Sequence, residues 1–257
     1  MILTKRVALG GRQLDEIDDA IVIRSIDPGT TKESVSAVSR MGGSGQRVTG
    51  EHFDTLEASV TFAIDAPKKM LSRRREIFDQ VISWALQKGW LTTNEMPDRR
   101  MYVDKVTVPN SGDLWNWTEE YTITFRAYNV PFWQAELPAT ASGNVAASGT
   151  VTVPVAGNVQ SVLDVTFQNR SGMTINNFWV QANGNRITLA NLALGGSETL
   201  AISHGTDGLL RIRKGSVSVY DKFTGADDLF VNPGNVPVSF QADRAGMLTV
   251  QSFGRWV

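Results

Sequence analysis

The chain has 257 residues, no cysteine and two histidines, and its 25 basic and 26 acidic side chains give a formal net charge of -1. Without cysteine, disulfides and thiolate chemistry are excluded, and two histidines are too few for a histidine-rich zinc site. The balanced charge argues against a dedicated nucleic-acid-binding domain, because such domains are usually basic.

The hydrophobic content of 42% is that of a folded chain, long enough for one large or two smaller domains. No apolar run approaches the ~18 residues of a membrane-spanning helix, and the run near the start is too short for a signal-peptide core. The sequence therefore predicts a folded chain without membrane insertion.

The composition changes near residue 136. Residues 136–148 are rich in alanine, serine, glycine and threonine and follow neither strand nor helix periodicity, so they are predicted to be a linker. Residues 1–135 hold 17 basic and 18 acidic side chains, whereas residues 136–257 hold 8 of each. This fall in charge density at a small-residue stretch predicts two domains, 1–135 and 149–257.

Strands are predicted in the first half at 20–23, 56–64, 101–108 and 121–127. In 56–64 and 121–127, apolar and polar residues alternate, which is typical of strands with one buried face. In 101–108 the alternation changes phase near Asp104, which predicts a bulge or a turn.

A long polar segment, residues 27–50, contains Gly42, Gly43 and Gly45. This composition predicts either a flexible loop or the tip of an extended hairpin. Two nearby arginines suggest a phosphate-binding loop, but the following helix and the lysine that such a loop needs are missing.

A helix is predicted to begin near Asp65 and to end at Gly89. Asp65 and Pro67 suit its first turn, and glycine is a typical residue at a helix end. The run Arg73–Arg75 is followed at once by acidic residues and predicts a solvated face or subunit salt bridges. Trp84 and Trp90 are predicted to pack in the core. Five apolar residues at helical spacing predict the buried face: Phe78, Val81, Ile82, Ala85 and Leu86.

A turn at 110–117 carries Trp115 and Trp117. Two tryptophans in one turn suit a sugar platform or a protein contact, and they equally suit a turn that packs under the sheet. The sequence leaves both interpretations open.

The second half predicts an all-β sandwich. Its short apolar runs are separated by glycine, asparagine, serine and proline turn signals, and none has helical periodicity. The runs are 151–155, 162–167, 178–180, 187–189, 200–202, 209–212, 217–220, 236–240 and 247–250.

No catalytic or cofactor signature is found in the sequence. His204 lies beside Ser203 and near Asp207, but triad members meet in space rather than along the chain, so His204 is interpreted as a turn histidine. Adjacent carboxylates such as Asp227 and Asp228 point to opposite sides of a strand, unlike a glycosidase pair. We therefore predict no enzyme activity, no catalytic residue, no metal site and no cofactor.

The order of the elements and three motifs resemble a known family. The motifs are the helix Arg73–Gly89 with the residues behind it (Trp90–Leu91 and Pro97–Arg100), the strand Thr124–Tyr128 leading to Pro131–Trp133, and Asn232–Asn235. Over essentially the whole chain, this order resembles the distal tail proteins of long-tailed bacteriophages, which are part of the phage tail-component family.

The resemblance implies an α+β ring-forming domain at 1–135, mostly β with one helix, and an outward-facing all-β galectin-like sandwich at 149–257. It implies a homo-hexameric ring at the distal end of the tail tube, which joins the tube protein to the tail-tip hub protein and serves as a platform for receptor-binding proteins in host adsorption. DNA would pass through the lumen without sequence-specific contacts. The implied location is the virion tail tip, after assembly in the bacterial cytoplasm.

Two other functions are carried as alternatives. The chain could be a carbohydrate-binding, lectin-like module, with Trp179 and Phe178 as aromatic contacts and Asn176 and Asn177 as their polar neighbours. It could also be another component of the baseplate hub. A hydrolase on the sandwich finds no supporting motif.

Overall fold

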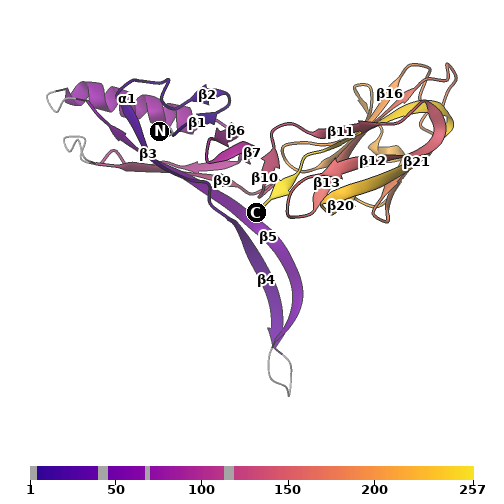
Figure 1. The fold of residues 1–257 in the computed structure, drawn as a ribbon, viewed down its shortest axis with the longest axis horizontal. Coiled ribbons are helices and arrows are strands. Elements are labelled where there is room, and N and C mark those ends of the chain that lie inside the picture. Colours follow the sequence, from indigo (N-terminus) through magenta and orange to yellow (C-terminus); the bar gives the residue numbers. More distant parts are fainter. Residues whose placement is uncertain (1–4, 40–45, 67–69, 113–118) are drawn as a thin grey trace. The chain divides into compact units, whose positions relative to one another are not determined.

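The computed structural model describes residues 5–39, 46–66, 70–112 and 119–257. They form two compact units, Met1–Trp133 together with Val257, and Gln134–Trp256. Strands dominate both units, and the α-helix α1 (Leu71–Ala85) belongs to the first (Figure 1). This mainly β architecture confirms the predicted fold class. No helix in the described part of the chain is long and apolar enough to cross a membrane.

The first unit is built on two antiparallel sheets. In one sheet the strands β2, β1, β6 and β7 are successive neighbours, and in the other β3, β5, β9 and β8 follow one another while β4 extends the pairing along β5. Their bounds are β1 (Val7–Leu9), β2 (Arg12–Gln13), β3 (Ile21–Asp27), β4 (Thr31–Ser39), β5 (Gln46–Ile64), β6 (Gly89–Thr93), β7 (Met96–Val103), β8 (Lys105–Thr107) and β9 (Tyr121–Ala127).

The core of the first unit follows the alternation seen in the sequence. Every second residue of β5 from Leu56 to Ile64 is buried, and so is every second residue of β9 from Tyr121 to Ala127. Helix α1 covers this buried face, because Trp84 packs edge-on against Phe125 at a ring-centroid distance of 6.0 Å. The strand predictions for 56–64 and 121–127 are confirmed.

The phase change near Asp104 is a break between two strands. Strand β7 ends at Val103 and β8 begins at Lys105. The Asp104 carboxylate accepts hydrogen bonds from the backbone N–H groups of Tyr128 (2.7 Å) and Asn129 (3.0 Å). Asp104 thus leaves the strand because its side chain organises the turn after β9.

The helix differs from its prediction at both ends and on its buried face. It begins at Leu71, and Met70 before it makes no side-chain cap. Leu86 lies past the last turn and is 59% exposed, whereas the side chain of Arg74 is fully buried. Trp84 is buried as predicted, and Trp90 is half-buried under the guanidinium of Arg100, 4.0 Å from the ring centroid. Hydrophobic periodicity does not predict a buried arginine, because arginine counts as a polar residue.

The polar segment 27–50 is mostly an extended hairpin, which was one of its two predicted forms. Strand β4 pairs with β5 from Thr31 opposite Leu56 to Ser39 opposite Gln46. The glycine-containing residues 40–45 lie outside the described residues. Because β9 pairs with β5 only from Leu56 to Phe62, the rest of this ribbon runs beyond the sheet (Figure 1). We call this ribbon, Thr31–Ser39 with Gln46–Thr55, the arm.

The second unit is an all-β fold around one apolar core. Its strands are β11 (Ala139–Ser142), β12 (Ala146–Val155), β13 (Ser161–Asn169), β14 (Phe178–Ala182), β15 (Asn185–Leu189), β16 (Thr199–His204), β17 (Leu210–Lys214), β18 (Val217–Ser218), β19 (Phe223–Gly225), β20 (Phe230–Val231), β21 (Gly234–Ser252) and β22 (Arg255–Trp256), with β10 (Trp133–Ala135) at the start of the unit. One 3-10 turn, η1 (Tyr220–Lys222), interrupts them.

Strand β21 organises this unit. The two strands predicted at 236–240 and 247–250 are one continuous strand. Its first part pairs with β12 and β14, and its second part pairs with β11 and β13. The residues between the two predicted strands remain in extended backbone.

The predicted linker 136–148 is wrong as a structural description. Within it, β11 pairs with the second part of β21, from Ala139 opposite Ser252 to Ser142 opposite Thr249, and β12 already begins at Ala146. The small side chains of β11 alternate between half-buried and exposed positions. They lack the large apolar residues by which a strand is usually recognised.

Candidate functional site

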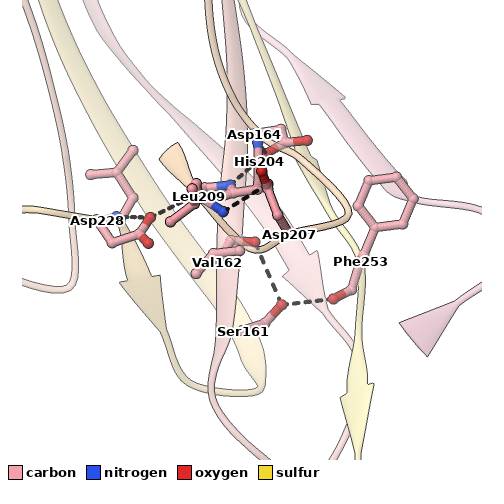
Figure 2. A network of polar contacts seen from close by, with 9 residues as sticks. Ser161, Val162, Asp164, His204, Asp207, Leu209, Asp228 and Phe253 are labelled. Carbon is pink, nitrogen blue, oxygen red and sulfur yellow. Dashed lines mark hydrogen bonds and ion pairs between the residues drawn. The ribbon is translucent and has the colours of Figure 1, made fainter. Parts of the chain in front are cut away.

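A buried cluster of charges lies inside the second unit, around His204 (Figure 2). His204 ends β16, and its side chain is 8% exposed. The ring nitrogen Nδ1 lies 2.8 Å from Oδ1 of Asp164 on β13, and Nε2 lies 2.6 Å from Oδ1 of Asp228, which precedes β20. The backbone N–H of His204 also donates to Asp164 at 3.0 Å. One imidazole therefore joins three separate segments of the unit.

The two carboxylates keep the imidazole charged. Burial by itself lowers the pKa of His204, but the hydrogen bonds and negative charges of Asp164 and Asp228 outweigh burial and raise the pKa to about 9. Burial also lowers the pKa of Arg255, whose charge interacts favourably with the same two aspartates. The cluster thus balances two carboxylates with an imidazolium and a guanidinium.

This arrangement does not have the geometry of a general base beside a nucleophile. A general base needs a free ring nitrogen that faces a nucleophile. Both nitrogens of His204 are occupied by carboxylates, and Asp207 instead accepts hydrogen bonds from Leu209 N–H (3.2 Å) and Arg211 (2.7 Å). The interpretation of His204 as a simple turn histidine is therefore wrong, because its ring is part of the packed interior.

Because His204 is charged in the folded state, the second unit is expected to lose stability as the pH rises into the alkaline range. A histidine whose folded-state pKa exceeds the unfolded value of about 6.5 contributes stability fully below that value and loses it as the pH rises through the folded-state pKa, here about 9. We expect the free energy of unfolding to fall by about 3 kcal/mol between pH 6.5 and pH 10 because of this group. Urea unfolding at a series of pH values measures this; a flat profile would contradict the assigned contacts.

The described ranges contain no candidate metal centre. They hold no group of three or more histidine, aspartate and glutamate side chains that is arranged to bind a metal ion. The turn with Trp115 and Trp117 falls in residues 113–118, which lie outside the described residues.

The residues considered for sugar binding lie in three different environments. Phe178 is buried in the core, and the backbone N–H groups of Asn176 and Asn177 both donate to Asp243, at 2.9 and 2.8 Å. Trp179 is half-buried on the outer side of β14, where its indole N–H donates to Gln241 and the guanidinium of Arg186 lies 4.1 Å from its ring centroid. Because Arg186 covers one face of the indole, that face is closed to a stacked sugar.

The arm is a candidate surface for protein contact in the first unit. On one side of the ribbon, Val35 is 53% exposed, and Glu33 of β4 is the cross-strand partner of Phe53 of β5. At the base of the arm, Lys32 (2.8 Å) and Arg126 (3.1 Å) both bind Glu57 and lower its pKa. The arm is thus a ribbon with a fixed base and an exposed apolar side chain.

The two-unit architecture, with paired sheets and a helix followed by an all-β unit, is similar to the fold of solved phage hub and baseplate proteins. In particular, the chain is similar to the Dit protein of phage SPP1, described as a paradigm of the hub adsorption apparatus in phages that infect Gram-positive bacteria: the TM-score is 0.69 with 11% identity, over 98% of this chain and 99% of that one.

A chain of the activated phage P2 baseplate is also similar, with a TM-score of 0.52 and 8% identity over 98% of both chains. No protein-family model and no curated protein sequence matches the chain. The similarity of fold thus agrees with the resemblance to phage distal tail proteins found in the sequence.

Proposed function

We propose that the chain is a structural protein of a phage tail tip. In this proposal, six copies form a ring at the distal end of the tail tube and join the tube protein to the tail-tip hub protein. The observation that carries it is the similarity to the SPP1 Dit protein, which extends through both units rather than through one common domain. A shared β-sandwich alone would be compatible with many functions.

The two units would have different roles. The first unit, with its high density of charged residues, would form the ring, and the second unit would face outward and hold adsorption or receptor-binding proteins. The lumen would let DNA pass without binding it, in keeping with the balanced charge of the first half. No enzyme activity is part of the proposal, which agrees with the similarity to a hub adsorption protein and a baseplate protein and with the occupied ring nitrogens of His204. The protein would be located at the virion tail tip after assembly in the host cytoplasm.

The arm supports the ring assembly. A closed ring repeats one heterologous contact, in which a surface of each copy meets a different surface of the next copy. The arm offers such a surface, because neither of its edges, Thr31–Ser39 or Gln46–Thr55, pairs with a further strand within the described residues. We expect the arm of one copy to lie against the first unit of the neighbouring copy.

Replacing Val35 by glutamate is expected to disrupt the ring, because a charge would be buried at the contact. Negative-stain imaging and mass photometry of the full chain measure the outcome: sixfold rings with six times the 28.1 kDa chain mass for the unmodified protein, and at least about tenfold weaker assembly for Val35→Glu.

Val145→Glu is the matched control, because Val145 is 52% exposed, nearly the same as Val35, but belongs to the second unit. Equal assembly of both variants would remove the arm from the contact. A closed assembly of another symmetry would contradict the hexamer, and binding of a monomer to a glycan array would favour the lectin alternative.

A further inference from the structure

A hollow lies at one edge of the sheet in the second unit, where β17 meets η1. It has a volume of about 360 Å³ and is lined by Leu210, Arg211, Ile212, Arg213, Ser218 and Tyr220. This volume falls within the range of sites that take a small ligand or a few side chains of a partner. The residues that line the hollow do not include His204, Asp164, Asp228 or Arg255.

The strand edge beside the hollow is paired along part of its length and open at Leu210. Strand β18 is the last strand at this end of the sheet, and it pairs only with Arg213 and Lys214 of β17. The carbonyl of Ile212 accepts the N–H of Val219 at 2.9 Å, so Ile212 turns its backbone groups toward this edge. By strand alternation, the backbone groups of Leu210 also point to this edge. Beside Leu210, the chain that follows β18 has already turned into η1. An extended segment can therefore pair with β17 at Leu210.

The side chains around this edge are apolar and cationic. Leu209 is 64% exposed, Val217 60% and Tyr220 49%. The two charged residues that line the hollow are arginines; Asp207 neutralises Arg211, whereas Arg213 has no ion pair among the described residues. Exposed apolar side chains together with an arginine are typical of surfaces that bind proteins.

We propose that this edge is a docking site for an acidic, extended segment of a partner protein. The segment would pair with the backbone of Leu210 at the start of β17, place an apolar side chain in the hollow between Leu210 and Tyr220, and direct a carboxylate to Arg213. Pairing at Leu210 fixes the position of the segment, while the hollow and the charge supply specificity. The inference deepens the proposed tail-tip function and rests on it, because it identifies the part of the second unit that would hold a partner.

The test is a titration of the uniformly ¹⁵N-labelled full chain with a short capped peptide in which glutamate alternates with valine. We expect saturable changes in the amide resonances of Leu209–Arg213 and Val217–Tyr220. A peptide with lysine in place of glutamate should leave them unchanged, and Arg213→Glu should weaken binding by at least about tenfold. Arg186→Glu is the control, because it makes the same change of charge on β15, near the other end of the strand order.

Three results would overturn the docking site: no saturable change with the glutamate peptide, equal binding of the lysine peptide, or unchanged affinity of Arg213→Glu. Arg213 is exposed, so its variant is expected to fold, and the unshifted amides of the core check this directly. The titration is read on the residues around the hollow, whereas ring formation is measured separately by imaging. Failure of the docking site and failure of the ring are therefore distinguishable.

Discussion

Replacing Gly29 by alanine is expected to lower the free energy of unfolding of the first unit by about 3 kcal/mol or more. Gly29 connects β3 to β4 with a φ of 67°, and a Cβ added there would lie 1.5 Å from the carbonyl oxygen of Glu57. Neither Gly29 nor the carbonyl group of Glu57 can move without separating β5 from β3 or from β4. Urea unfolding, with hydrogen exchange of the β5 amides as a second readout, measures the loss.

Gly10→Ala is the matched control for Gly29. Gly10 has a φ of 59°, close to that of Gly29, but a Cβ there would meet no atom within 4 Å. Only the cost of the left-handed backbone remains, about 1 kcal/mol. If both variants lose the same stability, the contact between Gly29 and Glu57 relaxes and the steric argument fails.

Replacing His204 by glutamine is expected to destabilise the second unit by about 3 kcal/mol at pH 7. Glutamine retains hydrogen-bonding atoms but carries no charge, so Asp164 and Asp228 would lose the cation between them while Arg255 alone opposed their charges. Removal of one member of a buried ion cluster leaves its partners desolvated and unbalanced. Urea unfolding at pH 7 measures the change.

The control for His204 is Asp207→Asn, which alters a nearby carboxylate that pairs with Arg211 at a partly exposed site. Its effect should stay below about 1 kcal/mol, as for other exposed ion pairs. His204→Gln should also abolish the fall in stability between pH 6.5 and pH 10. If that fall persists in the variant, another group causes it.

Sequence patterns predicted the strands whose periodicity is local. Residues 56–64 alternate because one face of β5 is buried along its whole pairing with β9, and the sequence records that directly. The arm was predicted only as one of two possibilities, since a two-stranded ribbon without a buried face leaves little alternation. Strand β11 was missed because pairing with β21, rather than apolar burial, holds it in place.

The charge cluster could not be predicted from the sequence. Asp164 and Asp228 stand 40 and 24 residues from His204, and no spacing rule joins an inward strand position, a strand end and a loop. Ser203 and Asp207, which are near His204 in the chain, were the residues considered as its partners from the sequence. The one available signal was that a histidine and two aspartates occupied a charge-poor half, where each charge needs a partner if it is buried.

The pairing of β21 has a consequence for synthesis of the chain. Four earlier strands, β11, β12, β13 and β14, all hydrogen-bond to this strand. During translation these four strands leave the ribosome before β21 does. The second unit can therefore complete its fold only once β21 has emerged, whereas the strands of the first unit are all available much earlier. Premature termination within β21 would leave a folded first unit attached to an unpaired, aggregation-prone second half.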